Sequence, residues 1–271
     1  MSTQTLENNS TAVGAGHDLF DSKGRCIPAD LSAPVSVVTR HYFKIKQPEV
    51  NPTDIYNRIS KNLGKPENLT AADFSLRLEK ILRELQADPS TRNIVNGVKV
   101  PFFIPKRPAG DMGAQLEATY LPAVSGAYAD VFPEYSFKNN FKDTLKNRFS
   151  VAPESRHNEL VSKISNEDVV GYYFPCLLEY SIPAMREIMA KLPNKFLLAG
   201  GFDTVAAMVG SPSLLFNKTS YPPLLWFAAL EAEKSEIGYF FEAYGYNLTF
   251  NRKPHFGSAA EYWAAGLVVL G

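Results

Sequence analysis

A dense run of large apolar side chains, YPPLLWFAALEAEKSEIGYFFEAYGY, extends from Tyr221 to Tyr246 and constrains the fold more than any other stretch. Within it Leu230, Ile237 and Phe241 are separated by seven and four residues, which is the spacing of one face of a helix. Two prolines at the start suit a first helical turn, and Gly245 suits a helix end. The run therefore predicts a buried helix at the centre of a C-terminal helical region.

The composition indicates a globular chain without a strong overall charge. Hydrophobic residues make up 45% of the 271 residues, which is enough for one large core or two modest ones. Lysine and arginine together number 28, and so do aspartate and glutamate. Because these charges cancel, no net field draws the whole molecule toward nucleic acid or an anionic membrane, and any basic surface must be local.

Cysteine usage and the absence of targeting signals bear on the compartment. Cys26 and Cys176 lie far apart and outside any CxxC pair, which argues against a disulfide framework or a structural zinc site. The N-terminus has no basic segment followed by an apolar one, so no signal peptide is expected. No apolar run approaches the roughly 20 residues that a membrane span needs. The sequence predicts a protein of the cytoplasm or of an assembled particle, with no membrane partner.

Local patterns divide the chain into three parts. Residues 1–18 are small and polar and predict a flexible arm. Residues 19–111 form an N-terminal region, in which period-two alternation at 33–47 predicts a strand or hairpin arm. Asn51 or Thr53 is expected to cap a short helix, and Thr70 a longer one. Prolines and glycines at its end predict a short strand, a loop and a subdomain boundary.

The third part, residues 112–271, is predicted to be a C-terminal helical region. Further helices are expected in it at 137–150, 166–180, 196–209 and 259–271. The predicted fold class is mainly α, a helical body with a short N-terminal strand or hairpin arm and little other sheet.

A basic stripe is predicted on segment 137–150. Three lysines recur there every four residues beside an apolar series with the same repeat, so a helix would carry two parallel stripes. With two following arginines the cations extend over roughly 15 Å, a spacing that suits successive phosphates of a nucleic acid. The competing interpretation is an ordinary solvated helix face. The nucleic-acid-binding candidates are Lys138, Lys142, Lys146, Arg148 and Arg156.

Motifs for catalysis and for metal or cofactor binding are absent from the sequence. The four histidines form no HxH or HExxH pattern, and neither a GxSxG elbow nor a phosphate-loop motif occurs. The sequence therefore predicts no metal, no cofactor and no catalytic residue. A pocket with convergent polar groups around His157, Cys176 or Asp203 would instead favour an enzyme, and a solid core there would argue against one.

Three classes of function stay open. The first is a self-assembling structural protein, coat or nucleocapsid-like, whose partners are its own copies and single-stranded nucleic acid. The second is an enzyme whose site is assembled from scattered residues, and the third is a helical adaptor or ligand-binding module with a pocket between helices. The flexible arm, the helical body and the basic stripe favour the first class, and the missing motifs weigh against an enzyme.

Overall fold

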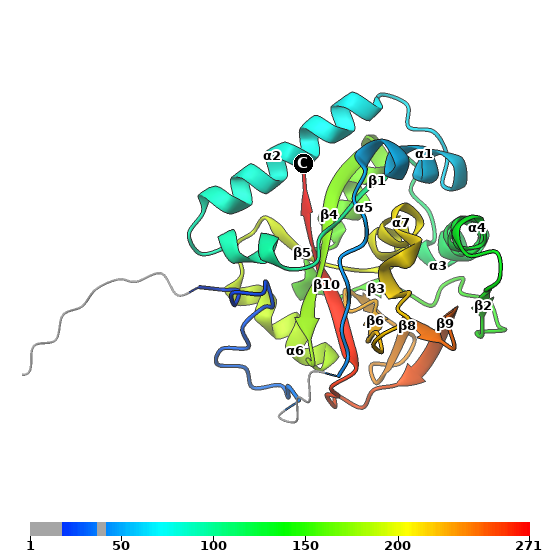
Figure 1. Cartoon of the computed structure of the whole chain (residues 1–271). Coiled ribbons are helices and arrows are strands. Elements are labelled where there is room, and N and C mark those ends of the chain that lie inside the picture. Colours follow the sequence, from blue (N-terminus) through cyan, green and yellow to red (C-terminus); the bar gives the residue numbers. More distant parts are fainter. Residues whose placement is uncertain (1–17, 37–41) are drawn as a thin grey trace, which may run out of the picture.

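A computed structural model describes residues 18–36 and 42–271 and is organised around a mixed β-sheet (Figure 1). The sheet has eight strands in the order β1-β4-β10-β6-β8-β9-β2, and β5 pairs with β10 beside this path. A separate two-stranded sheet joins β3 and β7. The prediction of a mainly α fold with little sheet is therefore wrong.

The strands within the described residues are β1 (Val100–Ile104), β2 (Phe137–Asn139), β3 (Ser150–Val151), β4 (Val169–Leu178), β5 (Phe196–Leu198), β6 (Leu224–Trp226), β7 (Leu230–Glu231), β8 (Ile237–Tyr244), β9 (Asn247–Pro254) and β10 (Trp263–Leu270). The α-helices are α1 (Pro52–Asn62), α2 (Ala71–Ala87), α3 (Met112–Gln115), α4 (Leu121–Val131), α5 (Asn158–Asn166), α6 (Ile182–Glu187) and α7 (Gly201–Gly210). Shorter helical turns are η1 (Arg92–Asn96), η2 (Leu116–Tyr120), η3 (Pro153–Ser155), η4 (Ile188–Lys191) and η5 (Pro212–Leu215).

Strand β4 is covered on both faces, with α2 and α7 on opposite sides of it (Figure 1). Successive side chains of a strand point to opposite faces. Tyr172 interacts electrostatically with Glu79 in α2, and Tyr173 lies beside Thr204 in α7. All but the last residue of β4 are buried. A strand buried on both faces is apolar at nearly every position and lacks the alternation that distinguishes a strand from a helix. The helix predicted at 166–180 is wrong for this reason.

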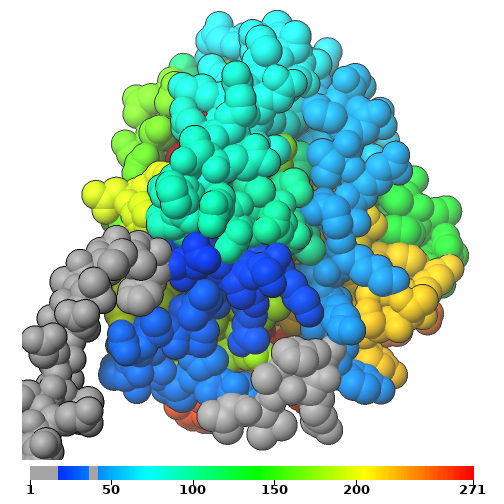
Figure 2. All heavy atoms as spheres, turned by 60° about the vertical axis from the view of Figure 1, so that its left-hand side comes forward, coloured from blue at the N-terminus to red at the C-terminus, as the bar shows by residue number. Residues whose placement is uncertain are grey.

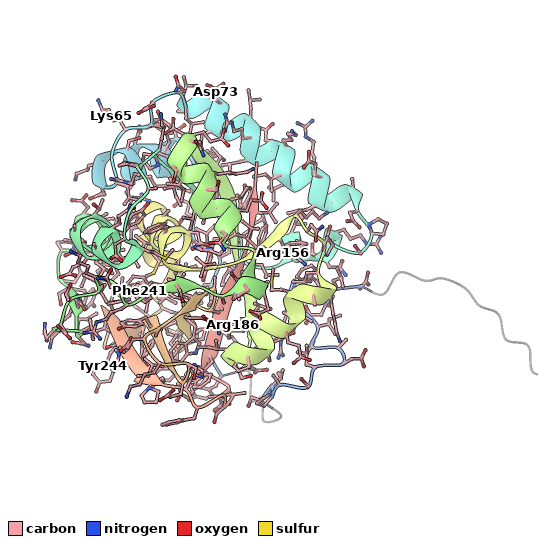
Figure 3. All side chains as sticks on the ribbon, turned by 180° about the vertical axis from the view of Figure 1, so that it is seen from behind. Lys65, Asp73, Arg156, Arg186, Phe241 and Tyr244 are labelled. Atoms are coloured by element: carbon pink, nitrogen blue, oxygen red, sulfur yellow. The ribbon has the colours of Figure 1, made fainter. Side chains whose placement is uncertain are left out.

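The run from Tyr221 to Tyr246, predicted to be one buried helix, forms strands β6, β7 and β8. Its apolar residues are indeed in the core, and Phe241 is fully buried while Tyr244 lies exposed near the hairpin tip (Figure 3). Gly245 does not end a helix. With Tyr246 it forms the two-residue turn between β8 and β9, and both residues have positive φ, 55° and 67°, as the favoured hairpin turns require.

Two other predicted helices are also wrong. The C-terminal segment 259–271 contributes β10, a central strand whose apolar residues fill the core between its neighbours. Segment 137–150 begins as β2, which pairs with β9, and then continues without regular structure as far as β3. The helix predicted at 196–209 is shared between β5 and α7.

Two predicted helix caps, at Asn51 and Thr70, are confirmed, whereas the capped helices predicted at 166–180 and 259–271 are strands. Asn51 accepts hydrogen bonds from the first turn of α1, and Thr70 forms a capping box with Asp73 at the start of α2. The short strand predicted within 97–111 is β1. The predicted strand at 33–47 is reduced to isolated bridges of Val35 and Phe43. Residues 37–41, and residues 1–17 of the arm predicted at 1–18, lie outside the described residues.

The N-terminal segment lies along β4 beyond the end of β1. Strand β1 pairs with β4 as far as Tyr173, and farther along β4 the Cys26 N–H donates to the Cys176 carbonyl at 3.0 Å. Figure 2 shows this blue segment on the surface below the cyan part of the chain. Residues from the predicted N-terminal and C-terminal regions thus share one sheet. Within the described residues, no helix is both long and apolar enough to cross a membrane.

Candidate functional site

The predicted basic stripe does not exist as a helix face. Lys138 is an exposed residue of β2, and the Lys142 ammonium donates to the carbonyl of Asn139 at 2.7 Å. Arg148 is paired with Asp143 and lies 3.4 Å from Glu233. Because the segment is not helical, the four-residue repeat no longer aligns these cations. Nucleic-acid binding by them stays a prediction without the geometry that motivated it.

Arg156, the last member of the predicted stripe, is labelled in Figure 3, and its side chain is hydrogen-bonded within the protein. Its guanidinium donates four hydrogen bonds of 2.5–3.2 Å to backbone carbonyls in segment 189–196. These carbonyls lie at and beyond the end of α6 and η4, where helix acceptors lack partners within the helix. Arg156 therefore stabilises the end of η4, and its guanidinium is already engaged by the protein.

A closed polar cluster lies at the start of α7. His157 and Asp203 are both fully buried, and His157 Nδ1 is 3.2 Å from the Leu198 carbonyl oxygen and 3.7 Å from Asp203 Oδ2. A carbonyl oxygen can only accept, so this contact places a proton on Nδ1. Asp203 Oδ1 accepts from the backbone N–H groups of Gly200 and Thr204, both at 2.9 Å. The carboxylate therefore caps α7 and faces the imidazole at the same time.

This cluster has no access to solvent. Burial raises the pKa of Asp203, and the neighbouring His157 acts in the opposite direction. The imidazole rests against Gly200, where an added Cβ would come within 2.6 Å of Nε2. Neither His157 nor Asp203 lines a described pocket. The solid core here argues against an enzyme site at these two residues.

Cys176, the third residue around which the sequence analysis considered a pocket, does line one. This pocket has a volume of about 810 Å³ and is formed by segments that are far apart in the sequence. The N-terminal segment, the strand end of β4, and the chain before β6 and before β10 meet there. The lining residues that bear on function are Asp21, Lys23, Arg25, Phe43, Lys44, Ile45, Val98, Cys176, Leu178, Glu179 and Glu261.

An ion pair that is largely buried lies in this pocket. Arg25 Nη2 donates to Glu179 Oε2 at 2.5 Å and to the Leu178 carbonyl at 3.1 Å. The side chain of Glu179 is 8% exposed and that of Arg25 is 23% exposed. Glu179 also has a φ of 71°, a left-handed conformation that costs a non-glycine residue about 1 kcal/mol or more. Strained residues with buried charge are concentrated at functional sites.

The position of Arg25 is set by a tight turn. Asp21 Oδ1 accepts from the backbone N–H groups of Lys23 and Arg25, both at 2.9 Å. Gly24 has a φ of 78°, and an added Cβ there would lie 2.4 Å from the nitrogen of Gly97. A glycine is therefore required both by the backbone conformation and by the close approach. The turn holds Lys23 and Arg25 at the pocket wall.

The cysteines of this region are not poised for nucleophilic chemistry. Burial raises the pKa of Cys26 to about 12, and burial likewise raises the pKa of Cys176 well above its usual value. The thiolate is the reactive form of cysteine, so both residues are held as inert thiols. The pocket thus offers charge and shape for binding, without an activated sulfur.

A second, smaller pocket of about 390 Å³ lies between the loop 215–222 and the turn of the β8–β9 hairpin. Its polar groups are largely engaged within the loop, where Asn217 Oδ1 accepts from the N–H groups of Thr219 and Ser220. The Thr219 hydroxyl also accepts from Lys46. This pocket is the weaker candidate because few of its donors and acceptors are free for a ligand.

Sequence reasoning missed Arg25 and Glu179. Neither residue belongs to a spacing motif, and the sequence signal at Glu179 is a lone carboxylate directly after an apolar run. Among residues 18–36 and 42–271, no group of three or more histidine, cysteine or acidic side chains is arranged to hold a metal ion. Comparison of the chain with known protein families, characterised proteins and solved structures finds no match.

Proposed function

We propose that this protein binds a small organic anion in the pocket beside the end of β4, with Arg25 as the group that recognises the anion. The observation that carries the proposal is the state of the Arg25 guanidinium. Its Nη2 is held by Leu178 and Glu179, whereas its Nη1 has no hydrogen bond to any residue that the structure describes. A guanidinium fixed on one side and free on the other is prepared to donate to a carboxylate or phosphate.

Three cations and three carboxylates line the pocket, so its preference for an anion depends on which of these groups are already engaged. Lys23 and Lys44 are exposed at the pocket and form no ion pair with another described residue, so they add positive charge. Of the three acidic residues, Asp21 accepts from backbone N–H groups, Glu179 is paired with Arg25, and Glu261 is also engaged within the protein. The charges of the lining balance, but the groups that remain free to bind a ligand are the cations Arg25, Lys23 and Lys44, and these donate to an anion.

The remaining wall is apolar and defines the rest of the ligand. Phe43, Ile45, Val98 and Leu178 line the pocket together with the charged residues. Small-molecule sites are commonly apolar cavities of about 300–1,000 Å³ with a few polar groups that fix orientation. A carboxylate or phosphate ester with a short apolar body fits both parts of the wall.

Among the functions predicted from the sequence, this proposal is nearest to the ligand-binding module, although the pocket lies at a strand end and not between helices. The self-assembling function remains a prediction. Two of its reasons, the mainly helical body and the helical basic stripe, are absent from the described fold.

Isothermal titration with four probes tests the proposal. Hexanoate and phenyl phosphate are expected to bind, while hexanamide and hexylammonium, which keep the apolar body but not the negative charge, are expected not to bind. Binding that does not distinguish hexanoate from hexanamide would contradict the recognition of an anion. Weakening of hexanoate binding by added salt is also expected, because Lys23 and Lys44 are solvent-exposed.

Variants separate recognition from positioning. Arg25→Gln should reduce hexanoate affinity at least about tenfold, because it removes a charge-assisted donor. Glu179→Gln should also weaken binding, since it frees Arg25 from its fixed orientation. Arg92→Gln is the matched control, because Arg92 is exposed and outside the pocket. Equal affinities for Arg25→Gln and Arg92→Gln would remove Arg25 from the proposal.

A further inference from the structure

Four aromatic rings surround the ammonium group of Lys253. Its Nζ lies 4.9 Å from the ring centroids of Phe240 and Tyr262, and 5.5 Å from those of Trp226 and Trp263. A cation within about 6 Å of a ring centroid is attracted by the ring's quadrupole, and tryptophan is the strongest of these partners. We call this set of four rings the cage.

The cage is assembled by the sheet. Lys253 on β9 is paired with Gly238 on β8, and Trp226 on β6 is paired with Phe240 on β8. An added Cβ at Gly238 would lie 2.7 Å from the Trp226 ring, so this glycine leaves the space that the ring occupies. Tyr262 and Trp263 come from the start of β10.

The walls of the cage are held by one another. The ring of Trp226 packs edge-on against Phe240 at 4.7 Å and against Trp263 at 5.1 Å. Trp226, Phe240 and Trp263 are buried, whereas Tyr262 and Lys253 are partly exposed. The cage is therefore preorganised on three sides and meets solvent on the side of Tyr262 and Lys253.

A primary ammonium is an imperfect occupant of this cage. It carries three N–H donors, yet no hydrogen bond or ion pair joins Lys253 Nζ to a residue in the described part of the chain, and the nearby Glu242 acts on it only through longer-range attraction. Aromatic faces attract the charge but are poor replacements for oxygen acceptors. A quaternary or methylated ammonium has methyl groups where lysine has N–H donors, so it presents apolar surface to the rings and loses fewer hydrogen bonds on entering.

We propose that the cage is a binding site for a quaternary or methylated ammonium ion, and that Lys253 occupies it as an internal competitor. Lys253 reaches the cage from its own strand and must leave before a ligand cation enters. The site is distinct from the anion pocket, although Tyr262 packs on Phe43 of that pocket at 5.7 Å. The cage proposal does not depend on the anion proposal.

Tryptophan fluorescence gives a direct test. The chain contains two tryptophans, Trp226 and Trp263, and both are walls of the cage. Titration of the wild-type protein with tetramethylammonium chloride is expected to change the emission in a saturable way. Sodium chloride at the same concentrations, and tert-butanol as an uncharged molecule of similar shape, are expected to give no saturable change.

Removal of the competitor should strengthen binding. Lys253→Ala is expected to raise the affinity for tetramethylammonium at least about tenfold, because no internal cation has to be displaced. Lys234→Ala, which removes an exposed lysine outside the cage, should leave the affinity unchanged. No saturable response in either the wild type or Lys253→Ala, or a response that tert-butanol reproduces, would overturn the proposal.

A second pair of variants keeps the test decisive if Lys253→Ala does not fold. Tyr262 is the partly exposed wall, so its replacement disturbs the core least. Tyr262→Leu should weaken tetramethylammonium binding several-fold, whereas Tyr262→Phe keeps the ring and should retain it. Equal affinities for Tyr262→Leu and Tyr262→Phe would show that the ring does not contact the cation.

Discussion

The His157–Asp203 cluster and the Arg25–Glu179 pair each place ionisable side chains inside the protein, yet they differ in access. The first two side chains are 0% exposed, and their contacts are to the backbone, to each other and to a glycine. The second two are 23% and 8% exposed and line a pocket. Buried ionisable groups without access to solvent thus indicate a structural cluster. Buried charge with a free donor at a cavity marks a site that can bind.

The largest expected effect tests whether the closed cluster is structural. Asp203→Ala removes the cap of α7 and leaves His157 without its carboxylate neighbour, so it should lower the free energy of unfolding by about 3–5 kcal/mol. Urea denaturation measures this change. A loss below about 1 kcal/mol, with hexanoate binding abolished, would reverse the comparison and place function at the closed cluster.

A tight contact within the same cluster should have the next largest effect. Gly200→Ala places a methyl group 2.6 Å from His157 Nε2, and the ring is fully buried and held by its contact with the Leu198 carbonyl. We expect a loss of about 1–3 kcal/mol in urea denaturation. Gly110→Ala is the control, since its added methyl meets the flexible end of Gln115 and should cost less. Equal losses would mean that the cluster is not tightly packed.

Variants of Glu179 test the role of the Arg25–Glu179 pair in the pocket. Glu179→Gly relieves the left-handed backbone while it removes the ion pair, so stability should stay within about 1 kcal/mol of the wild type. Glu179→Ala keeps the strain and should be less stable than Glu179→Gly by about 1 kcal/mol. Both variants should weaken hexanoate binding. Full binding by Glu179→Gly would show that Glu179 has no role in positioning Arg25.

The pH dependence of stability gives a test of sign. Burial raises the pKa of Asp203 above its usual value of 3.8, so between that pH and the pKa of the folded state the folded protein keeps a proton that the unfolded chain has lost. Stability contributed by this group is therefore present below that value and is lost as pH rises through the folded pKa. Urea denaturation at a series of pH values measures this effect. The free energy of unfolding of the wild type relative to that of Asp203→Asn should decrease as the pH rises.

Asp88 is the matched control for the direction in which stability changes with pH. A hydrogen bond from Ser90 and the nearby Lys195 lower its pKa from 3.8 to about 2. The contribution of Asp88 is thus complete above pH 3.8 and is lost as the pH falls toward about 2, which is the opposite direction. Asp88 is partly exposed, so the effect of Asp88→Asn should be small. The same slope for both variants would contradict the assignment for Asp203.

The smallest effect is expected for the lysines once assigned to a basic stripe. Replacement of Lys138, Lys142 and Lys146 together by Gln should change the free energy of unfolding by less than about 0.5 kcal/mol, since all three are exposed. Binding of single-stranded nucleic acid, measured over a range of salt concentrations, completes the test. A salt slope that is present in the wild type and reduced in the triple variant would restore these lysines as a functional surface.

The sequence by itself determined the features that depend on a few neighbouring residues. Asn51 and Thr70 start helices because their side chains satisfy N–H groups two or three residues away. Gly245 marks a chain reversal, although the sequence did not distinguish a helix end from a hairpin turn, since both favour a left-handed residue. Such local hydrogen bonds and backbone preferences are the same in any fold that contains the segment.

Only the tertiary structure decided the sheet and the candidate sites. Strands β4 and β10 are apolar along most of their length because neighbouring elements cover them, so their sequences lack the alternation that identifies a strand. Arg25 and Glu179 are 154 positions apart and meet because the N-terminal segment lies along β4. The cage likewise needs β6, β8, β9 and β10 together. Contacts between distant segments depend on packing that no local pattern encodes.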